Sequence, residues 1–158
     1  MNKAMQKVLK EYTDNGGSVF ISGAYIGSDL CRDKKKDNPD RKFVETVLKY
    51  KWRTDHAATT GEINAVSEDF DNNISTFAFC TDFNSRIYKV EAPDGIEPAD
   101  ISDAKTIMRY NENNISAAVA YKGKYKIVAF GFPFETIEKQ EHRNAIMKNI
   151  MDFLIKNE

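Results

Sequence analysis

The sequence of 158 residues predicts a single α/β domain, an open three-layer sheet that is partly parallel and carries an antiparallel C-terminal hairpin. Three observations favour this class. A helical pattern runs into a glycine turn and a short apolar strand within residues 3–22. Two β-rich runs flank Lys122-Gly123-Lys124, and an amphipathic segment ends the chain. Helices that alternate with apolar strands are typical of a sheet covered by helices on both faces.

The first predicted element is a helix over residues 3–14, with an apolar face that we expect to be buried. This face consists of the residues at i, i+3, i+4 and i+7, namely Met5, Val8, Leu9 and Tyr12. Gly16 and Gly17 end the helix, and residues 18–22 form the next strand. A helix that opens such a domain packs on a sheet already begun. We therefore expect residues 1–158 to be the C-terminal part of a longer chain.

The remaining elements follow from periodicity and turn residues. Asp40 is expected to cap the helix that follows the first polar loop. In chain order we predict a polar loop over 29–41, a helix over 41–50, short strands over 63–66 and 76–81, an edge strand over 86–91, a loop set by Pro93, Gly95 and Pro98, hairpin strands over 116–121 and 125–130, and a helix over 140–156.

The composition describes a soluble globular domain without a strong overall charge. The chain is 41% hydrophobic and 30% charged, and its formal net charge is −1. A balance this close to neutral disfavours nucleic acid as a partner. No apolar run is long enough to cross a bilayer, so we expect no membrane insertion.

Residues 16–27 resemble a known family. Gly16-Gly17, an apolar strand and the run 23–27 (GAYIG) are similar to the elbow of class I glutamine amidotransferase-like domains, whose fold is flavodoxin-like. Residues 130–135 (FGFPFE) resemble the segment that carries the catalytic histidine and glutamate of that family. The runs 50–53 (YKWR) and 131–135 look like domains of bacterial proteins named xanthan lyases. The resemblance implies a polysaccharide context and an extracellular, periplasmic or cell-surface location.

The sequence departs from that family at its catalytic positions. Tyr25 stands where the nucleophilic cysteine would be, and Phe132-Pro133-Phe134 covers the histidine position. A phenol with a pKa of about 10 is a poor nucleophile at neutral pH. Glu135 remains, but a carboxylate without an imidazole to orient does not drive acyl transfer. We therefore predict no catalysis and no cofactor, or else a hydrolase or lyase whose first candidates are Tyr25, His56 and Glu135.

Other catalytic groups near the elbow are few. Ser22, Ser28 and Cys31 are candidate nucleophiles, with Cys31 expected in the charged loop. His56, beside Asp55, is the histidine that we consider as their partner, because it lies in a loop. No spacing rule supports such a pair, and the plainer interpretation makes Ser28 a turn residue and His56 a surface residue. The second histidine, His142, is expected on the exposed side of the last helix.

The spacing of the histidines, cysteines and acidic residues along the sequence does not predict a metal site. The histidines and cysteines lack the spacing of a zinc site. Asp69, Asp71 and Asn73 alternate as calcium ligands often do, but no glycine or bidentate glutamate completes the loop. We predict a solvated turn there and no metal site.

Saccharide binding is the function that the aromatic residues favour. Sugars stack on exposed aromatic rings, and the expected crevice lies at the carboxyl ends of the strands. The predicted binding set is Gly23, Tyr25, Gly27, Asp29, Trp52, Arg53, Phe132 and Phe134. The alternative is that these aromatics, with Tyr50, fill the core.

We therefore predict a non-catalytic scaffold or carbohydrate-binding module of a larger polysaccharide-related protein, with a polysaccharide or oligosaccharide as partner. Two alternatives remain open. One is a hydrolase or polysaccharide lyase with its site at the elbow. The other is an interaction module that pairs with itself through a free sheet edge. The exposure of Tyr25 separates a silent scaffold from a binding crevice.

Overall fold

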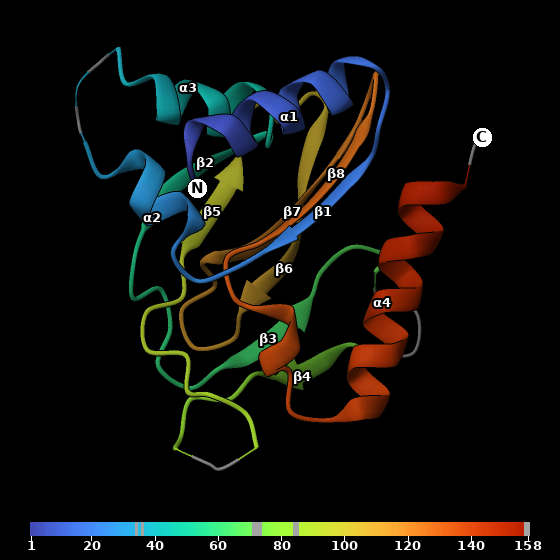
Figure 1. Cartoon of the computed structure of the whole chain (residues 1–158). Coiled ribbons are helices and arrows are strands. Elements are labelled where there is room, and N and C mark those ends of the chain that lie inside the picture. Colours follow the sequence, from blue (N-terminus) through green and yellow to red (C-terminus); the bar gives the residue numbers. More distant parts are fainter. Residues whose placement is uncertain (34, 36, 71–73, 84–85, 157–158) are drawn as a thin grey trace.

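The computed structural model describes residues 1–33, 35, 37–70, 74–83 and 86–156. A six-stranded sheet runs through it in the order β1-β8-β7-β6-β3-β4, and β2 and β5 form a separate two-stranded sheet (Figure 1). The strands are β1 (Val19–Ser22), β2 (Tyr50–Thr54), β3 (Glu62–Ala65), β4 (Thr76–Ala78), β5 (Gly95–Pro98), β6 (Ala104–Tyr110), β7 (Ser116–Lys122) and β8 (Lys126–Phe130).

The six-stranded sheet is mixed. β1 lies parallel to β8, whereas the pairs β8-β7, β7-β6, β6-β3 and β3-β4 are antiparallel in the part of the chain that the structure describes. Lys122 pairs with Lys126 at the hairpin turn. The α/β class, the partly parallel sheet and the C-terminal hairpin are thus confirmed, and the flavodoxin-like arrangement stays a prediction.

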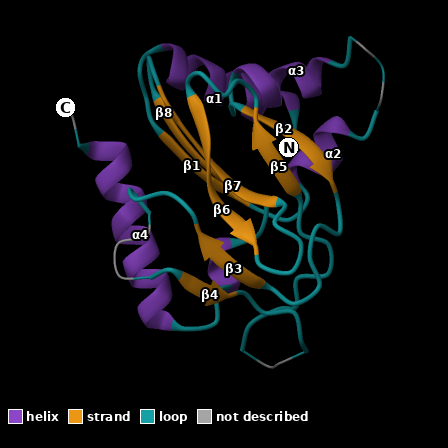
Figure 2. Cartoon of the chain, turned by 180° about the vertical axis from the view of Figure 1, so that it is seen from behind, coloured by secondary structure: helices purple, strands orange, loops and turns teal. Residues whose placement is uncertain are grey.

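Helices lie on both faces of this sheet. Figures 1 and 2 show α1 (Lys3–Asp14), α2 (Ile26–Cys31) and α3 (Pro39–Thr46) on one side and α4 (Gln140–Ile155) on the other. A short 3-10 turn, Phe134–Thr136, connects β8 to the approach of α4. No helix among the described residues is long and apolar enough to cross a membrane.

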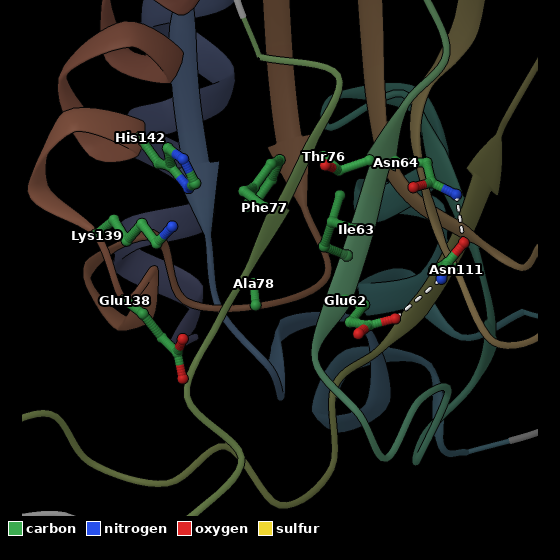
Figure 3. A pocket seen from close by; sticks show the side chains of 10 residues that line it. All are labelled: Glu62, Ile63, Asn64, Thr76, Phe77, Ala78, Asn111, Glu138, Lys139 and His142. Atoms are coloured by element: carbon green, nitrogen blue, oxygen red, sulfur yellow. Dashed lines mark hydrogen bonds between the residues drawn. The ribbon is translucent and has the colours of Figure 1, made fainter.

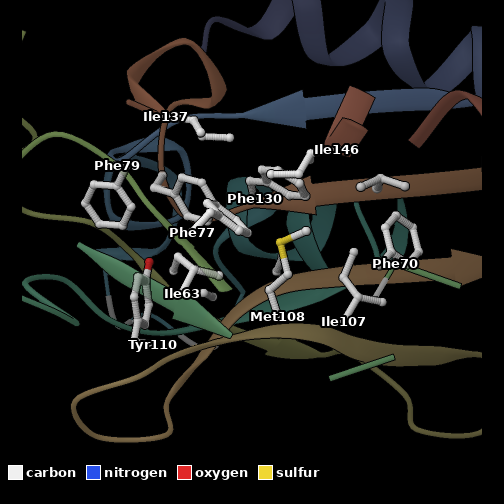
Figure 4. Close-up of a cluster of buried hydrophobic side chains, with 14 of the residues drawn as sticks. Ile63, Phe70, Phe77, Phe79, Ile107, Met108, Tyr110, Phe130, Ile137 and Ile146 are labelled. Carbon is white, nitrogen blue, oxygen red and sulfur yellow. The ribbon is translucent and has the colours of Figure 1, made fainter. Parts of the chain in front are cut away.

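Two hydrophobic clusters fill the space on either side of the sheet. Because side chains alternate along a strand, Ile127 and Ala129 of β8 join the cluster under α1–α3, while Val128 and Phe130 join the cluster that includes α4. Figure 4 shows Phe130, Met108 and Ile146 of the second cluster meeting. β8 is therefore buried on both faces, which fixes its carboxyl end, and the segment after it, in place.

The predicted loop over 29–41 is wrong at both ends. Helix α2 extends to Cys31, which is 2% exposed, and α3 starts at Pro39. The cap of α3 is Asn38 rather than Asp40, because the Asn38 side chain accepts hydrogen bonds from the Asp40 and Arg41 amides. The apolar residues of α2 pack against β2, so tertiary packing holds a helix of only six residues.

Residues 86–91 form no strand, and the expected loop around Gly95 contains β5 instead. β5 tolerates Pro98 because it ends there and pairs with one neighbour, β2. The face of α1 is a further correction. Gln6 and Thr13 are its buried residues, whereas Met5, Val8 and Tyr12 are each more than half exposed.

Candidate functional site

The elbow joins β1 to α2. The strand ends at Ser22, residues 23–25 bend, and α2 starts at Ile26. Tyr25 has φ −124° and ψ 9°, outside the left-handed region that a strained nucleophile elbow uses. Its side chain points outward and is 48% exposed. The ring of Tyr25 is therefore available to a ligand, as the binding hypothesis requires.

The side chain of Asp94 binds the start of α2 through hydrogen bonds. Its Oδ2 accepts hydrogen bonds from the amides of Gly27 (2.9 Å) and Ser28 (3.2 Å). Its Oδ1 accepts from Nε1 of Trp52 (3.0 Å). Asp94 is 1% exposed, and this burial raises the pKa of its carboxyl to about 6 against the opposing effect of the three donors. The carboxylate thus satisfies two of the backbone amides in the first turn of α2.

The backbone of Asp94 ties in two further segments. Its carbonyl accepts from the Tyr110 hydroxyl (2.7 Å), and its amide donates to the Gly131 carbonyl (2.7 Å). A Cβ at position 131 would lie 2.0 Å from the Asp94 oxygen, so glycine is required there. Asp94 therefore fixes α2, Trp52 and the segment after β8 relative to one another.

A cavity of about 390 Å³ opens beside the elbow. It is lined by residues 22–26, residues 88–91, Met1, Asp29, Pro133 and Glu135. Its volume lies within the range of small-molecule sites, about 300–1,000 Å³. It sits where the parallel strands β1 and β8 end, which is the edge where the sequence places a crevice.

The polar wall of this cavity is mainly acidic. Asp29, Glu91 and Glu135 face it, with Lys89 as the basic residue of the lining. The Tyr88 hydroxyl donates to Oε1 of Glu135 (2.7 Å). Burial, and then this bond to a carboxylate, raise the pKa of Tyr88 above its usual range. Tyr88 therefore keeps its proton at neutral pH and is a donor, not a base.

The cavity brings together only part of the predicted binding set. Gly23, Tyr25 and Asp29 of that set line it, and so does Glu135, which was predicted as a catalytic candidate. Gly27 is buried below, where a Cβ would lie 2.7 Å from Cδ1 of Trp52.

The other predicted aromatics belong to the interior or its margin. Phe132 is fully buried and stacks on Phe79 and Phe130, with ring centroids 5.0 Å apart in each pair. Phe134 packs edge-on against Phe20 and is partly buried. Trp52 is partly buried under α2, and Tyr50 is 3% exposed. Arg53 forms an ion pair with Glu97 on the small sheet.

Of the three catalytic candidates, Tyr25 and Glu135 line the elbow cavity, whereas His56 lies elsewhere. His56 is exposed, has φ 48° and pairs with its neighbour Asp55 (Nδ1 to Oδ1, 3.5 Å). It does not line the elbow cavity. Burial raises the pKa of the Cys31 thiol to about 11, so the thiol stays protonated at neutral pH. Ser28 is buried under the elbow, and Oγ of Ser22 accepts from the Phe134 amide (3.3 Å).

Among the described residues, no three histidine, cysteine, aspartate or glutamate side chains lie together in a way that could hold a metal ion. Asp71 and Asn73 of the predicted turn lie outside these residues, while Asp69 pairs with Lys105.

A second cavity, of about 560 Å³, lies across β3, β4 and the start of α4. Figure 3 shows its polar wall, where the Asn64 amide donates to Oδ1 of Asn111 and the Asn111 amide donates to Oε2 of Glu62. Two hydrogen bonds thus link these three side chains into a row. His142 lines the opposite side and is half-buried, which corrects its expected exposure.

Two residues of the elbow site were not predicted from the sequence. Tyr88 lies in the supposed edge strand, and its exposed ring faces the cavity. Asp94 lies between Pro93 and the glycine of β5, and the one available signal was a carboxylate held between two turn-forming residues. Both reach the site through tertiary contacts over more than forty positions.

Comparisons with known proteins show the fold. No protein-family model and no curated protein matches the chain. Among solved structures, exo-β-1,4-mannosidase Op5Man5 from Opitutaceae bacterium strain TAV5 matches with a TM-score of 0.58 and 12% identity. The mmIFT52 N-terminal domain matches with a TM-score of 0.52 and 13% identity. Both matches cover 100% of this chain, which spans 24% of the mannosidase and 73% of the mmIFT52 chain.

Proposed function

We propose that this chain is a non-catalytic carbohydrate-binding module, and that a neutral saccharide binds in the elbow cavity. The observation that carries the proposal is the exposed ring of Tyr25 beside a cavity lined by Asp29, Glu91 and Glu135. A sugar offers an apolar face of C–H groups and a rim of hydroxyls. The ring suits the face, and carboxylates accept strong hydrogen bonds from hydroxyl donors.

The charge of the lining selects against acidic sugars. The lining side chains carry three carboxylates and one ammonium group, so a uronate would meet net repulsion from them. Tyr88 adds a hydroxyl whose proton is engaged by Glu135 and whose oxygen can accept. This balance favours a neutral oligosaccharide over an anionic polysaccharide.

The absence of catalysis is also part of the proposal. Acyl transfer needs a nucleophile beside a base, but Tyr25 stands at the nucleophile position and no histidine lines the elbow cavity. Elimination from a uronate needs a base and a group that neutralises the substrate carboxylate. Tyr88, hydrogen-bonded to Glu135, has its pKa raised rather than lowered and does not supply that base.

The fold gives the proposal a context. A chain named an exo-β-1,4-mannosidase contains a segment of this fold. The proposal also agrees with the resemblance to amidotransferase-like domains, in which this chain would have Tyr25 in place of the nucleophile and would keep a cavity at the elbow.

Calorimetry with neutral and acidic oligosaccharides tests the proposal, with β-1,4-manno-oligosaccharides as the first neutral probe. We expect the wild type to bind a neutral probe and Tyr25→Ala to bind it about tenfold more weakly, which corresponds to about 1.4 kcal/mol. Phe83→Ala is the matched control, because Phe83 is 92% exposed and lies outside the cavity lining. A wild type that binds no neutral probe, or a Tyr25→Ala variant with unchanged affinity, would contradict the proposal.

A further inference from the structure

The charges that line the elbow cavity do not balance. Asp29, Glu91 and Glu135 contribute three carboxylates, and Lys89 contributes one ammonium group. Met1 also lines the cavity, and even with its amino group counted the acids remain in excess. A neutral saccharide leaves this excess without a counter-charge, so the lining suits a ligand that carries positive charge.

The three carboxylates are not neutralised within the part of the chain that the structure describes. None of them forms an ion pair with a described residue. Glu135 accepts a hydrogen bond from the Tyr88 hydroxyl (2.7 Å), an uncharged donor that leaves the carboxylate its charge. The side chains of Asp29 and Glu91 form no hydrogen bond with a described residue. Their oxygens are therefore available to a ligand.

The three acids reach the cavity from separate parts of the fold. Asp29 lies one helical turn after Tyr25, whose carbonyl accepts a hydrogen bond from the Asp29 amide (3.0 Å). Glu135 lies in the 3-10 turn after β8, and Glu91 lies in the segment between β4 and β5. A ligand in the cavity therefore meets carboxylates that are held independently of one another.

This arrangement suits an organic cation rather than a metal ion. Among the described residues, no three histidine, cysteine, aspartate or glutamate side chains are placed to hold one metal ion. The carboxylates therefore act as separate acceptors. A positive charge on a larger organic ligand can reach one of them while the rest of the ligand fills the cavity of about 390 Å³.

Two tyrosine rings add to the preference for a cation. Tyr25 and Tyr88 both line the cavity, and they are 48% and 55% exposed. The face of an aromatic ring attracts an ammonium group and also packs against the apolar face of a sugar. A sugar that carries an ammonium group therefore uses both the rings and the carboxylates of the lining.

We propose that the elbow cavity prefers an amino sugar with a free ammonium group over the same sugar without charge. This inference rests on the proposed saccharide binding and names the class of sugar within it. The pyranose ring stacks on Tyr25, and the ammonium group donates to the carboxylates of the lining. Hydrogen bonds between charged groups are about twice as strong as those between neutral groups, so an ammonium group in place of a hydroxyl should raise the affinity.

Calorimetry with three β-1,4-linked oligosaccharides of equal length tests this preference. They differ at C2 of each sugar, with a hydroxyl in the cello-oligosaccharide, an acetamide in the chito-oligosaccharide and an ammonium group in its de-N-acetylated form. We expect the ammonium form to bind about tenfold more tightly than either neutral form at low salt. The preference should shrink as salt is added, because salt screens charges that lie near solvent.

The Glu91→Gln variant separates the charge of the lining from its shape. Glu91 is exposed, and its side chain forms no hydrogen bond with a described residue, so the variant should fold as the wild type does. It should weaken binding of the ammonium form about threefold more than it weakens binding of the neutral forms. Glu68→Gln is the matched control, because Glu68 is exposed and lies outside the cavity lining.

The outcomes distinguish this inference from the proposed function. Equal affinity for the charged and neutral forms overturns the preference and leaves saccharide binding in place. Binding of a manno-oligosaccharide but of none of these three probes has the same meaning. A trilysine peptide that binds as tightly as the ammonium form also overturns the preference, because the cavity would then recognise charge alone. If no saccharide binds, the proposed function fails and this inference fails with it.

Discussion

Asp94 accepts three hydrogen bonds and is almost fully withdrawn from solvent, and these two facts have opposite effects on its charge. Burial raises the pKa of the carboxyl to about 6, while the amides of Gly27 and Ser28 and the Trp52 indole favour the charged form. The result is a carboxylate that titrates near neutral pH under the elbow. The start of α2 is thus held by the Asp94 carboxylate, whose charged form is destabilised by its burial.

The pH dependence of stability tests this residue. The folded pKa of Asp94 lies above its unfolded value, so the stability that this group contributes is present below about pH 4 and is lost as pH rises through about 6. We expect the free energy of unfolding of the wild type, relative to Asp94→Asn, to fall between pH 4 and 7 by up to about 3 kcal/mol. The single tryptophan, Trp52, which bonds to Asp94, reports urea unfolding by fluorescence.

The difference between the two proteins is the quantity to measure, because other carboxylates act in the opposite direction. Ion pairs and hydrogen bonds lower the pKa of Asp14, Asp40 and Asp152, and their contribution is lost as pH falls. Subtraction removes these shared effects. A difference that is flat, or that grows with pH, would show that Asp94 is not a buried carboxylate with a raised pKa.

Between elements, one side chain joins α2 to α3. Asn38 is 8% exposed, and its Oδ1 accepts from the Asp40 and Arg41 amides at the start of α3. Its Nδ2 donates to the Leu30 and Asp33 carbonyls at the end of α2 (3.1 Å each). The amide thus caps one helix and satisfies the end of the other, which holds the short α2 against the small sheet.

Substitution of Asn38 tests this junction. Asn38→Ala should lower the free energy of unfolding by about 2–3 kcal/mol, because it removes the cap and leaves the buried Leu30 carbonyl without this donor. Asn38→Asp keeps the acceptor and loses the donors, so its cost should be intermediate at neutral pH. Urea unfolding measures both variants. If Asn38→Asp is as stable as the wild type, the bonds to α2 contribute nothing.

Elements with local signals were predictable from the sequence, and those that depend on distant pairing were not. The hairpin of β7 and β8 and the helix α4 carry their turn residues and periodicity within a short window. In β6 the register shifts near Met108, so the neighbours Ile107 and Met108 are both buried and the alternation is broken. At the site, Tyr25 and Glu135 follow from local motifs, whereas Asp94 and Tyr88 reach it from a different segment.

At the scale of the whole molecule, the elbow cavity lies at one end of the six-stranded sheet. Ser22, at the end of β1, lines it together with Pro133 and Glu135, which follow β8. Because β8 packs against a hydrophobic cluster on each face, the segment that follows it is held in place, and with it this wall of the cavity.

Chemical-shift mapping with a neutral oligosaccharide tests the central claim most directly, because it locates the ligand as well as detecting it. We titrate the ¹⁵N-labelled chain with a β-1,4-manno-oligosaccharide and follow the backbone amides. The account predicts shifts centred on Gly23, Tyr25 and Glu135 around the elbow cavity. Shifts centred on Asn64 and His142 at the second cavity, or no shifts with any neutral saccharide, would contradict it.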